Sequence, residues 1–131
     1  DQAPLPDQLK ALIRCTDALS ARSTGLHVNV CINYSGRAEL VHAARRIAAA
    51  GIAPEAIDEA LVSANLDTAG IPDPDLIIRT SGEIRTSNFL LWESAYAEYY
   101  FTPVLWPDFD RAELYRAIAS YQARSRRFGA V

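Results

Sequence analysis

Hydrophobic residues recur at helical spacing in several parts of the chain. Between Pro6 and about Ser23, leucine and isoleucine stand three or four positions apart, and Thr24 and Gly25 follow as a typical C-terminal stop. A second apolar stripe runs through residues 37–50 and ends at Gly51. Three further helices are predicted: a short one over residues 57–62 after Pro54 and Glu55, one over about 88–96 capped by Ser87 or Asn88, and a last one over Leu114 to Tyr121 capped by Asp110.

Other segments have the patterns of strands. The sequence LHVNVCINY at 26–34 alternates strictly between apolar and mixed positions, which predicts a strand with one apolar face. We expect Val28, Val30 and Ile32 to pack on helices of this chain. The apolar run in DLIIRT at 75–80 predicts a strand buried on both faces, and residues 99–101 form a third short strand. Strands that alternate with helices predict an α/β domain with a mostly parallel central sheet flanked by helices.

Composition narrows the class of protein. The chain has 131 residues, of which 50% are hydrophobic and 22% charged, so it suits one globular domain. Its formal charge of -3 argues against a general nucleic-acid binder. Cys15 and Cys31 stand alone and the two histidines lack metal spacing, which favours a reduced, cytoplasmic protein without a cysteine or histidine metal site. No apolar run is long enough to span a membrane, and no signal peptide opens the sequence.

The sequence IRTSGEIRTSN at 78–88 contains the clearest candidate site. Arg79 ends a predicted strand, where open α/β sheets bind ligands, and Arg85 follows a glycine turn. Ser87 lies at the start of the predicted helix, whose free N–H groups favour an anion. These groups can surround a diphosphate. Alternatively, the two arginines pair with Glu83, Asp75 or Glu93 and have a structural role.

Two further features allow two interpretations each. Glu98 is a lone carboxylate among aromatic residues, and it is either a Mg²⁺ ligand or a surface residue at a helix end. The chain ends in RSRRFGAV, where the arginines complement the dipole of the last helix and Gly129 fits an ordinary tail.

Four segments carry a resemblance to a known family. NYSGR at 33–37, PDPDLIIRTSGEIRTSNFLLW at 72–92, AYAEYYFTPVLWPDF at 95–109 and SRRFG at 125–129 occur in this order. Together they resemble the cis-prenyltransferases of the undecaprenyl diphosphate synthase type, over about residues 24–129. The resemblance implies the undecaprenyl diphosphate synthase-like fold. It also implies a Mg²⁺-dependent condensation of isopentenyl diphosphate with an allylic prenyl diphosphate, giving a cis-prenyl diphosphate.

The same resemblance implies roles for individual residues. Arg79, Arg85 and Ser87 match the positions that hold isopentenyl diphosphate, and Glu98 matches a carboxylate that shares in metal binding. Arg127 and Gly129 match the C-terminal Arg-x-Gly, which in the family reaches into a neighbouring subunit's site. The implied partners are prenyl diphosphate substrates and a second copy of the chain, with contact to a membrane surface through the lipid product and no nucleic acid.

The sequence also departs from the family. The phosphate-binding loop with the catalytic aspartate, which lies in the family's N-terminal part, has no match here. The catalytic residue is therefore unknown, and we expect residues 1–131 to be the C-terminal part of a single domain whose N-terminal part is missing. Ser35 stands where glycine is usual, and Glu93 where glutamine is common. Glu93 is expected to add negative charge near the site.

Several functions remain open at this point. An enzyme of the same fold can join two short allylic diphosphates in an irregular linkage. A non-catalytic partner subunit keeps the fold without a complete site, although the presence of Arg79, Arg85, Ser87 and Glu98 argues against it. A general phosphate-binding module is a weaker third option. The sequence leaves the chain length of the product and the allylic substrate open.

Overall fold

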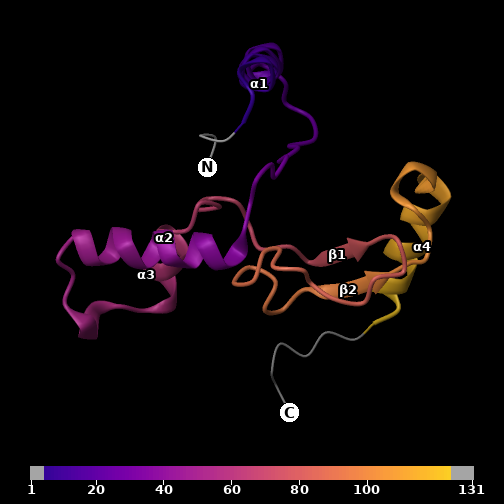
Figure 1. Ribbon diagram of the computed structural model, residues 1–131. Helices are drawn as coiled ribbons and strands as arrows, with labels where there is room; N and C mark the ends of the chain where they lie inside the picture. The colour runs from indigo at the N-terminus through magenta and orange to yellow at the C-terminus, as the bar shows by residue number, and fades with distance from the viewer. Residues whose placement is uncertain (1–4, 125–131) are drawn as a thin grey trace. The chain divides into compact units, whose positions relative to one another are not determined.

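The computed structural model describes residues 5–124 and divides the chain into two compact units, residues 1–34 and 35–131. The first unit contains α1, Asp7–Ser20, which is drawn in indigo in Figure 1. This helix starts directly after Pro6 and has Asp7 in its first turn, where a negative charge is favourable. The helix predicted between Pro6 and about Ser23 is confirmed.

The strand predicted at residues 26–34 is wrong for the described chain. These residues have no regular secondary structure, and no described segment pairs with them in a sheet. Val28 and Val30 are 68% and 75% exposed, so their predicted packing on helices of this chain is also wrong. A strand needs a hydrogen-bonded neighbour, and the alternating pattern alone does not supply one.

The second unit contains a sheet of two parallel strands, β1, Leu76–Arg79, and β2, Glu98–Phe101 (Figure 1). Leu76 is paired with Glu98, and Arg79 with Phe101. The helix α4, Arg111–Gln122, packs on β2. The predicted α/β architecture with parallel strands and flanking helices is confirmed. β1 is half-buried at all four positions, so the prediction of burial on both faces is wrong. Within residues 5–124, β1 has a single strand neighbour.

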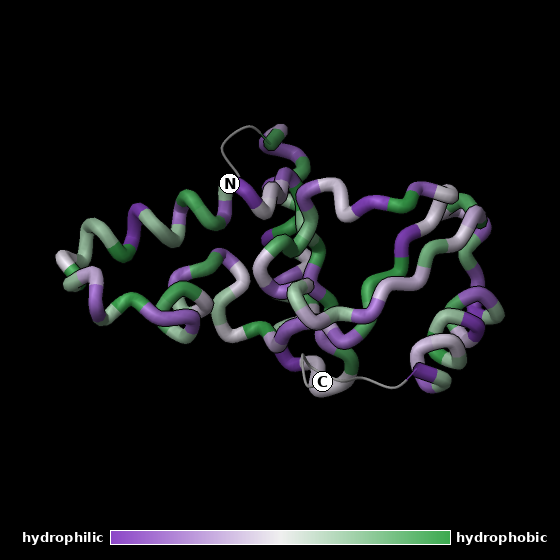
Figure 2. Tube along the Cα trace, turned by 90° about the horizontal axis from the view of Figure 1, so that it is seen from below, coloured by the Kyte–Doolittle hydropathy of each residue, from purple (hydrophilic) through white to green (hydrophobic). Residues whose placement is uncertain are grey.

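Two helices that precede β1 in the sequence pack against each other. They are α2, Gly36–Ala49, and α3, Glu59–Ala64. Short 3-10 turns lie at Pro54–Ala56 and Trp106–Asp108. The trace of α2 in Figure 2 alternates between hydrophilic and hydrophobic residues, and its buried side includes Ala43 and Ile47. Side-chain caps fix the starts of the helices: Ser35 accepts a bond from the α2 backbone, Asp58 from α3, and Asp110, as predicted, from α4.

The helix predicted over residues 88–96 is wrong, because this segment is a series of turns. Ser87, Asn88 and Leu90 have positive φ angles of 51°, 63° and 45°. An α-helix needs φ near about -63°, so these residues cannot start one. No helix among residues 5–124 has the length and the apolar character that a membrane span needs.

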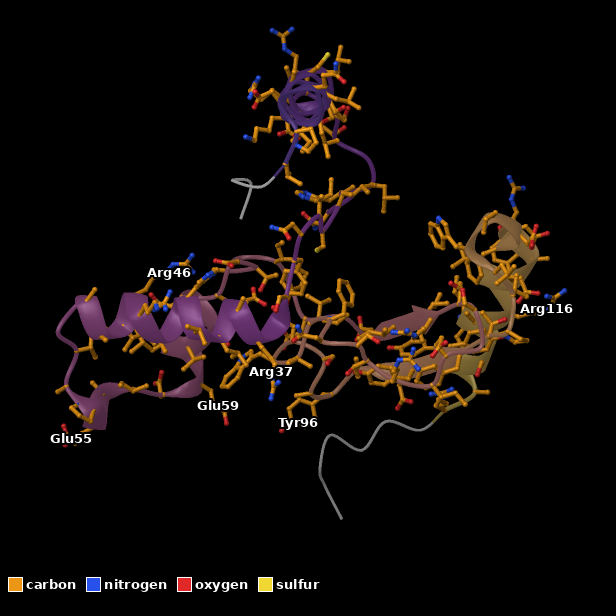
Figure 3. All side chains as sticks on the ribbon, in the orientation of Figure 1. Arg37, Arg46, Glu55, Glu59, Tyr96 and Arg116 are labelled. Atoms are coloured by element: carbon orange, nitrogen blue, oxygen red, sulfur yellow. The ribbon has the colours of Figure 1, made fainter. Side chains whose placement is uncertain are left out.

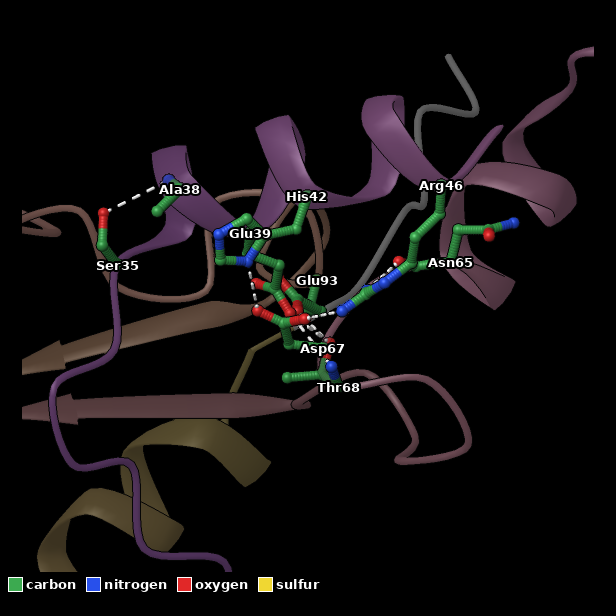
Figure 4. A network of polar contacts seen from close by, with 9 residues as sticks. All are labelled: Ser35, Ala38, Glu39, His42, Arg46, Asn65, Asp67, Thr68 and Glu93. Atoms are coloured by element: carbon green, nitrogen blue, oxygen red, sulfur yellow. Dashed lines mark hydrogen bonds and ion pairs between the residues drawn. The ribbon is translucent and has the colours of Figure 1, made fainter. Parts of the chain in front are cut away.

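A charged network holds α2 to the loop that follows α3 (Figure 4). Asp67 bonds to His42 Nδ1 at 3.0 Å and to Arg46 Nη2 at 2.5 Å, and Arg46 also donates to the carbonyl of Asn65. Burial raises the pKa of Asp67, but the hydrogen bonds and charges of His42 and Arg46 outweigh this effect and hold its pKa below the usual value.

This network predicts a loss of stability at acid pH. Because the pKa of Asp67 is lower in the folded protein than in the unfolded chain, its stabilisation is complete above about pH 4 and disappears as the pH falls through the folded value. The side chain of Asp67 is 34% exposed, so screening limits the effect to about 0.5 kcal/mol. Asp67→Asn should therefore flatten the stability curve measured by urea unfolding below about pH 4. Asp17→Asn, at an exposed position on α1, is the control, and parallel curves for the two variants would contradict the prediction.

Candidate active site

A pocket of about 190 Å³ lies at the sheet and at the turn that follows β1. Its lining comes from β1, β2 and the turn, and consists of Ile77, Ile78, Arg79, Arg85, Thr86, Ser87, Phe89 and Tyr99. Three of the predicted diphosphate ligands, Arg79, Arg85 and Ser87, are therefore brought together. Among residues 5–124, the lining contains two guanidinium groups and no acidic residue, which is the charge pattern of an anion site.

Backbone bonds fix the position of the turn relative to β2. The carbonyl of Arg79 accepts a bond from the N–H of Thr102 at 2.9 Å. The N–H groups of Ser81 and Gly82 donate to the carbonyls of Val104 and Thr102 at 2.8 and 2.9 Å. Ser81 and Gly82 both have φ of 71°, which lets the chain reverse direction directly after Arg79. The turn therefore presents Arg85 and Ser87 next to the end of β1.

The two arginines differ in their partners. Arg85 forms an ion pair with Glu83, and both side chains are well exposed. The guanidinium of Arg79 and the hydroxyl of Ser87 have no hydrogen-bond partner among residues 5–124. The structural alternative, in which acids pair with the arginines, therefore applies to Arg85 and not to Arg79. Because an exposed ion pair is weak, a phosphate can replace Glu83 as the partner of Arg85 at low cost.

Asn88 joins the turn to the start of α2. Its Oδ1 accepts a bond from the Arg37 N–H at 2.9 Å, and its carbonyl accepts one from the Gly36 N–H, also at 2.9 Å. Its Nδ2 donates to the hydroxyl of Ser35 at 2.8 Å. Asn88 thus caps α2 rather than a helix of its own. Sequence reasoning missed this contact because Arg37 and Asn88 stand 51 positions apart.

Glu98 lies apart from the pocket. It is paired with Leu76 at the start of the sheet, whereas Arg79 is paired with Phe101 at its end. Side chains alternate along a strand, so Glu98 projects from the opposite face to Tyr99, which lines the pocket. Its Oε2 accepts a bond from Arg124 Nη1 at 2.6 Å.

The predicted metal and subunit roles are not tested by this geometry. Residues 5–124 contain no group of three or more histidine, cysteine, aspartate or glutamate side chains that could hold a metal ion. Glu98 alone is an incomplete Mg²⁺ site, so its predicted role stays a prediction. Arg127 and Gly129 lie outside the described residues.

Two buried carboxylates lie beside Thr68, below α2 in the view of Figure 4. Glu39 and Glu93 are 1% and 5% exposed, and both approach the hydroxyl of Thr68. The Thr68 N–H also donates to Glu39 at 3.0 Å. Glu93 does not line the pocket of Arg79 and Arg85, but a second cavity of about 160 Å³. No periodic pattern in the sequence predicts this cluster, because its members come from three separate segments.

This cluster predicts a stabilising substitution. The Thr68 hydroxyl has one proton and two carboxylate neighbours, and Glu93 Oε2 has no hydrogen-bond partner among residues 5–124. In Glu93→Gln an amide N–H can donate to Thr68, and one buried charge is removed. We expect the free energy of unfolding to rise by about 1 kcal/mol in urea titrations. Glu59→Gln, at a position that projects into solvent in Figure 3, is the matched control and should change nothing. A loss of stability in Glu93→Gln would contradict the assignment.

Sequence comparisons identify relatives over the whole chain. The model of a family described as putative undecaprenyl diphosphate synthase matches residues 1–129. An isoprenyl transferase of Prochlorococcus marinus is 50% identical over 100% of this chain and 50% of that protein. An isoprenyl transferase of Brucella abortus is 52% identical over 100% of this chain and 53% of that protein. The chain thus spans about half the length of the curated relatives that it matches.

Solved structures give the same result. Lavandulyl diphosphate synthase from Lavandula x intermedia, in complex with dimethylallyl diphosphate, matches with a TM-score of 0.92 and 44% identity, over 98% of this chain and 57% of that one. A probable undecaprenyl diphosphate synthase from Campylobacter jejuni matches with a TM-score of 0.84 and 33% identity, over 98% of this chain and 60% of that one. The chain belongs to the undecaprenyl diphosphate synthase family of cis-prenyltransferases.

Proposed function

We propose that the protein is a prenyltransferase that condenses isopentenyl diphosphate with an allylic prenyl diphosphate, giving a cis-prenyl diphosphate. Its relatives are isoprenyl transferases, and a similar structure holds dimethylallyl diphosphate. The observation that carries the proposal is the pocket that Arg79, Arg85 and Ser87 line, to which the described part of the chain contributes no acidic residue. We assign the diphosphate of isopentenyl diphosphate to this pocket.

The residues of the pocket suit binding and orientation of that substrate. A guanidinium donates two parallel hydrogen bonds to phosphate oxygens, and Arg79 has none of its donors engaged within the described chain. The Ser87 hydroxyl supplies a further donor. Ile77, Phe89 and Tyr99 offer apolar surface for the five-carbon tail. The described residues thus fix one substrate, so that its double bond can be presented to the allylic carbon from which a second diphosphate leaves.

A second candidate has its own support. Lavandulyl diphosphate synthase is 44% identical to this chain, so a synthase that joins two short allylic units in an irregular linkage is the alternative. A non-catalytic partner subunit is less well supported, because it has no need of an acid-free pocket with two arginines.

The experiment is a turnover assay with product analysis. The full-length protein is incubated with Mg²⁺ and labelled isopentenyl diphosphate, with dimethylallyl, geranyl or farnesyl diphosphate as the second substrate. Products are dephosphorylated and identified by mass spectrometry and by the geometry of the new double bond. We expect a regular cis product. A product formed from dimethylallyl diphosphate alone would favour the irregular linkage, and a folded protein with no turnover would contradict an enzymatic role.

We further propose that the reaction depends on Mg²⁺ and that Glu98 shares in binding it. The described residues supply one carboxylate, which lies apart from the diphosphate pocket, so the ion would take its other ligands from groups outside residues 5–124 and from the diphosphate of the allylic substrate. Mg²⁺ would supply charge compensation for the phosphates.

The ion pair with Arg124 allows a matched test of Glu98. Glu98→Gln should raise the Mg²⁺ concentration for half-maximal activity by about tenfold, because an amide oxygen binds the ion less well than a carboxylate. Arg124→Gln breaks the same ion pair from its other side and should leave the Mg²⁺ dependence unchanged. Equal shifts in both variants would show that Glu98 acts only through the ion pair.

The proposal extends to the oligomeric state of the protein and to its place in the cell. We propose a cytoplasmic homodimer in which Arg127 and Gly129 reach the site of the partner subunit, with membrane contact through the lipid product. Sedimentation of the full-length protein and of Arg127→Ala, compared with their activities, separates a loss of dimerisation from a loss of the site.

A further inference from the structure

We infer that Asn88 is a positioning residue for the diphosphate pocket, acting through the α2 N-terminus on Thr86 and Ser87. The inference rests on the proposed function for its ligand, isopentenyl diphosphate, and on the hydrogen bonds of Asn88 for its geometry. Asn88 does not line the pocket, but residues on both sides of it, Ser87 and Phe89, do. A shift of Asn88 therefore moves the pocket lining directly.

The backbone at this point is strained. Ser87 and Asn88 are consecutive residues with φ of 51° and 63°, and neither is glycine. Such a conformation persists only where surrounding contacts hold it, and it is common where a chain positions a ligand. Asparagine tolerates a positive φ better than most residues, whereas serine has less reason to adopt it. The contacts of Asn88 are therefore what holds Ser87 in place.

The start of α2 supplies those contacts. The N–H groups of Gly36 and Arg37 are among the first of the helix, which have no partner inside it, and both donate to Asn88. Ser35 accepts from Asn88 Nδ2 at 2.8 Å and from the Ala38 N–H at 3.3 Å, so one hydroxyl serves both the helix and the turn. Asn88 is thus held at three points by one helix end.

The close approach depends on glycine at position 36. A Cβ atom on Gly36 would lie 2.9 Å from Leu91 Cγ and 3.2 Å from the carbonyl oxygen of Asn88. Gly36 is also buried. The turn and the helix are therefore in contact through their backbones. Because backbone atoms cannot move independently, the position of α2 constrains the position of Ser87.

The consequence is an effect on substrate binding rather than on turnover. Arg79 belongs to β1 and keeps its own backbone bonds when Asn88 is changed. Thr86 and Ser87 lose their support, so the pocket must be ordered again each time a diphosphate binds. We expect Asn88→Ala to raise the KM for isopentenyl diphosphate about tenfold, with kcat within about twofold of the wild type.

Conservative variants separate positioning from general stability. Asn88→Asp keeps the acceptor for Arg37 and places a negative charge at a helix N-terminus, so it should restore KM to within about threefold. Asn88→Gly tolerates the positive φ but lacks the side chain, so it should behave like Asn88→Ala. If Asn88→Ala fails to fold, Asn88→Gly carries the test. Asp58→Ala removes the cap of α3, and should lower stability by a similar amount without a change in KM.

Two readouts make the outcomes decisive. The first is KM and kcat, together with equilibrium binding of isopentenyl diphosphate and of inorganic pyrophosphate. The second is amide hydrogen exchange, in which Asn88→Ala should accelerate exchange at residues 86–91 and Asp58→Ala should not. If the wild type binds neither diphosphate, the proposed function fails, and hydrogen exchange still decides whether Asn88 orders the turn. Unchanged KM and unchanged exchange in Asn88→Gly would overturn the inference.

Discussion

Replacing Arg79 with alanine is expected to raise the KM for isopentenyl diphosphate about a hundredfold. Arg79 ends β1 inside the pocket, and its guanidinium makes no competing bond within residues 5–124. Its pair of charge-assisted bonds to a phosphate is worth about 3 kcal/mol, and their loss is therefore a loss of about two orders of magnitude in affinity. Steady-state kinetics and equilibrium binding of isopentenyl diphosphate measure the effect.

Two comparisons sharpen the result for Arg79. Arg79→Lys keeps the charge but lacks the planar fork, so it should recover only part of the affinity. Arg85→Ala should cost less than Arg79→Ala, because wild-type Arg85 must first leave Glu83. Arg116→Ala is the control, since Arg116 lies on α4 and projects into solvent in Figure 3. If Arg79→Ala has the same KM for isopentenyl diphosphate as Arg116→Ala, the diphosphate does not bind in this pocket.

Local sequence signals predicted those elements that local contacts determine. Asp110 caps α4 through the backbone of Glu113 three residues later, so the motif contains both partners. The apolar run that ends at Arg79 likewise predicted β1. The strand at 26–34 failed because its pattern describes one side of a pairing whose other side no described residue provides. Alternation shows that a segment is suited to a sheet, but not that a neighbour is present.

In the site, too, sequence patterns predicted the features that depend on local contacts and missed those that depend on distant ones. Arg79, Arg85 and Ser87 stand around a single turn, so their convergence was predictable from a short segment. The helix expected at 88–96 was wrong because Asn88 bonds to α2 rather than to its own following residues. Propensity favoured a cap at this position, and the position is a cap, but for a helix far away in sequence. The paired carboxylates Glu39 and Glu93 were also missed, because they too come from segments far apart in the sequence.

Gly36→Ala is expected to introduce the closest contacts of any glycine-to-alanine substitution among residues 5–124. The new Cβ would meet Leu91 Cγ at 2.9 Å and two backbone atoms, Asn88 O and Leu91 N, at 3.2 Å. Backbone cannot rotate away as a side-chain end can, so either α2 or the turn must move. Overpacking of this kind costs about 1–3 kcal/mol, and it outweighs the better helix propensity of alanine.

The methyl group should damage the pocket as well as the fold. Moving the turn breaks the bonds from Gly36 and Arg37 to Asn88, which leaves the N–H group of the buried Gly36 without its partner at the helix start. We therefore expect the free energy of unfolding to fall by about 2 kcal/mol in urea titrations, and the KM for isopentenyl diphosphate to rise. Gly25→Ala is the matched control, because a Cβ there meets no atom within 4 Å and the substitution should be neutral or slightly stabilising. If Gly36→Ala unfolds at the same urea concentration as Gly25→Ala, α2 and the turn do not make the backbone contact on which the positioning of Ser87 depends.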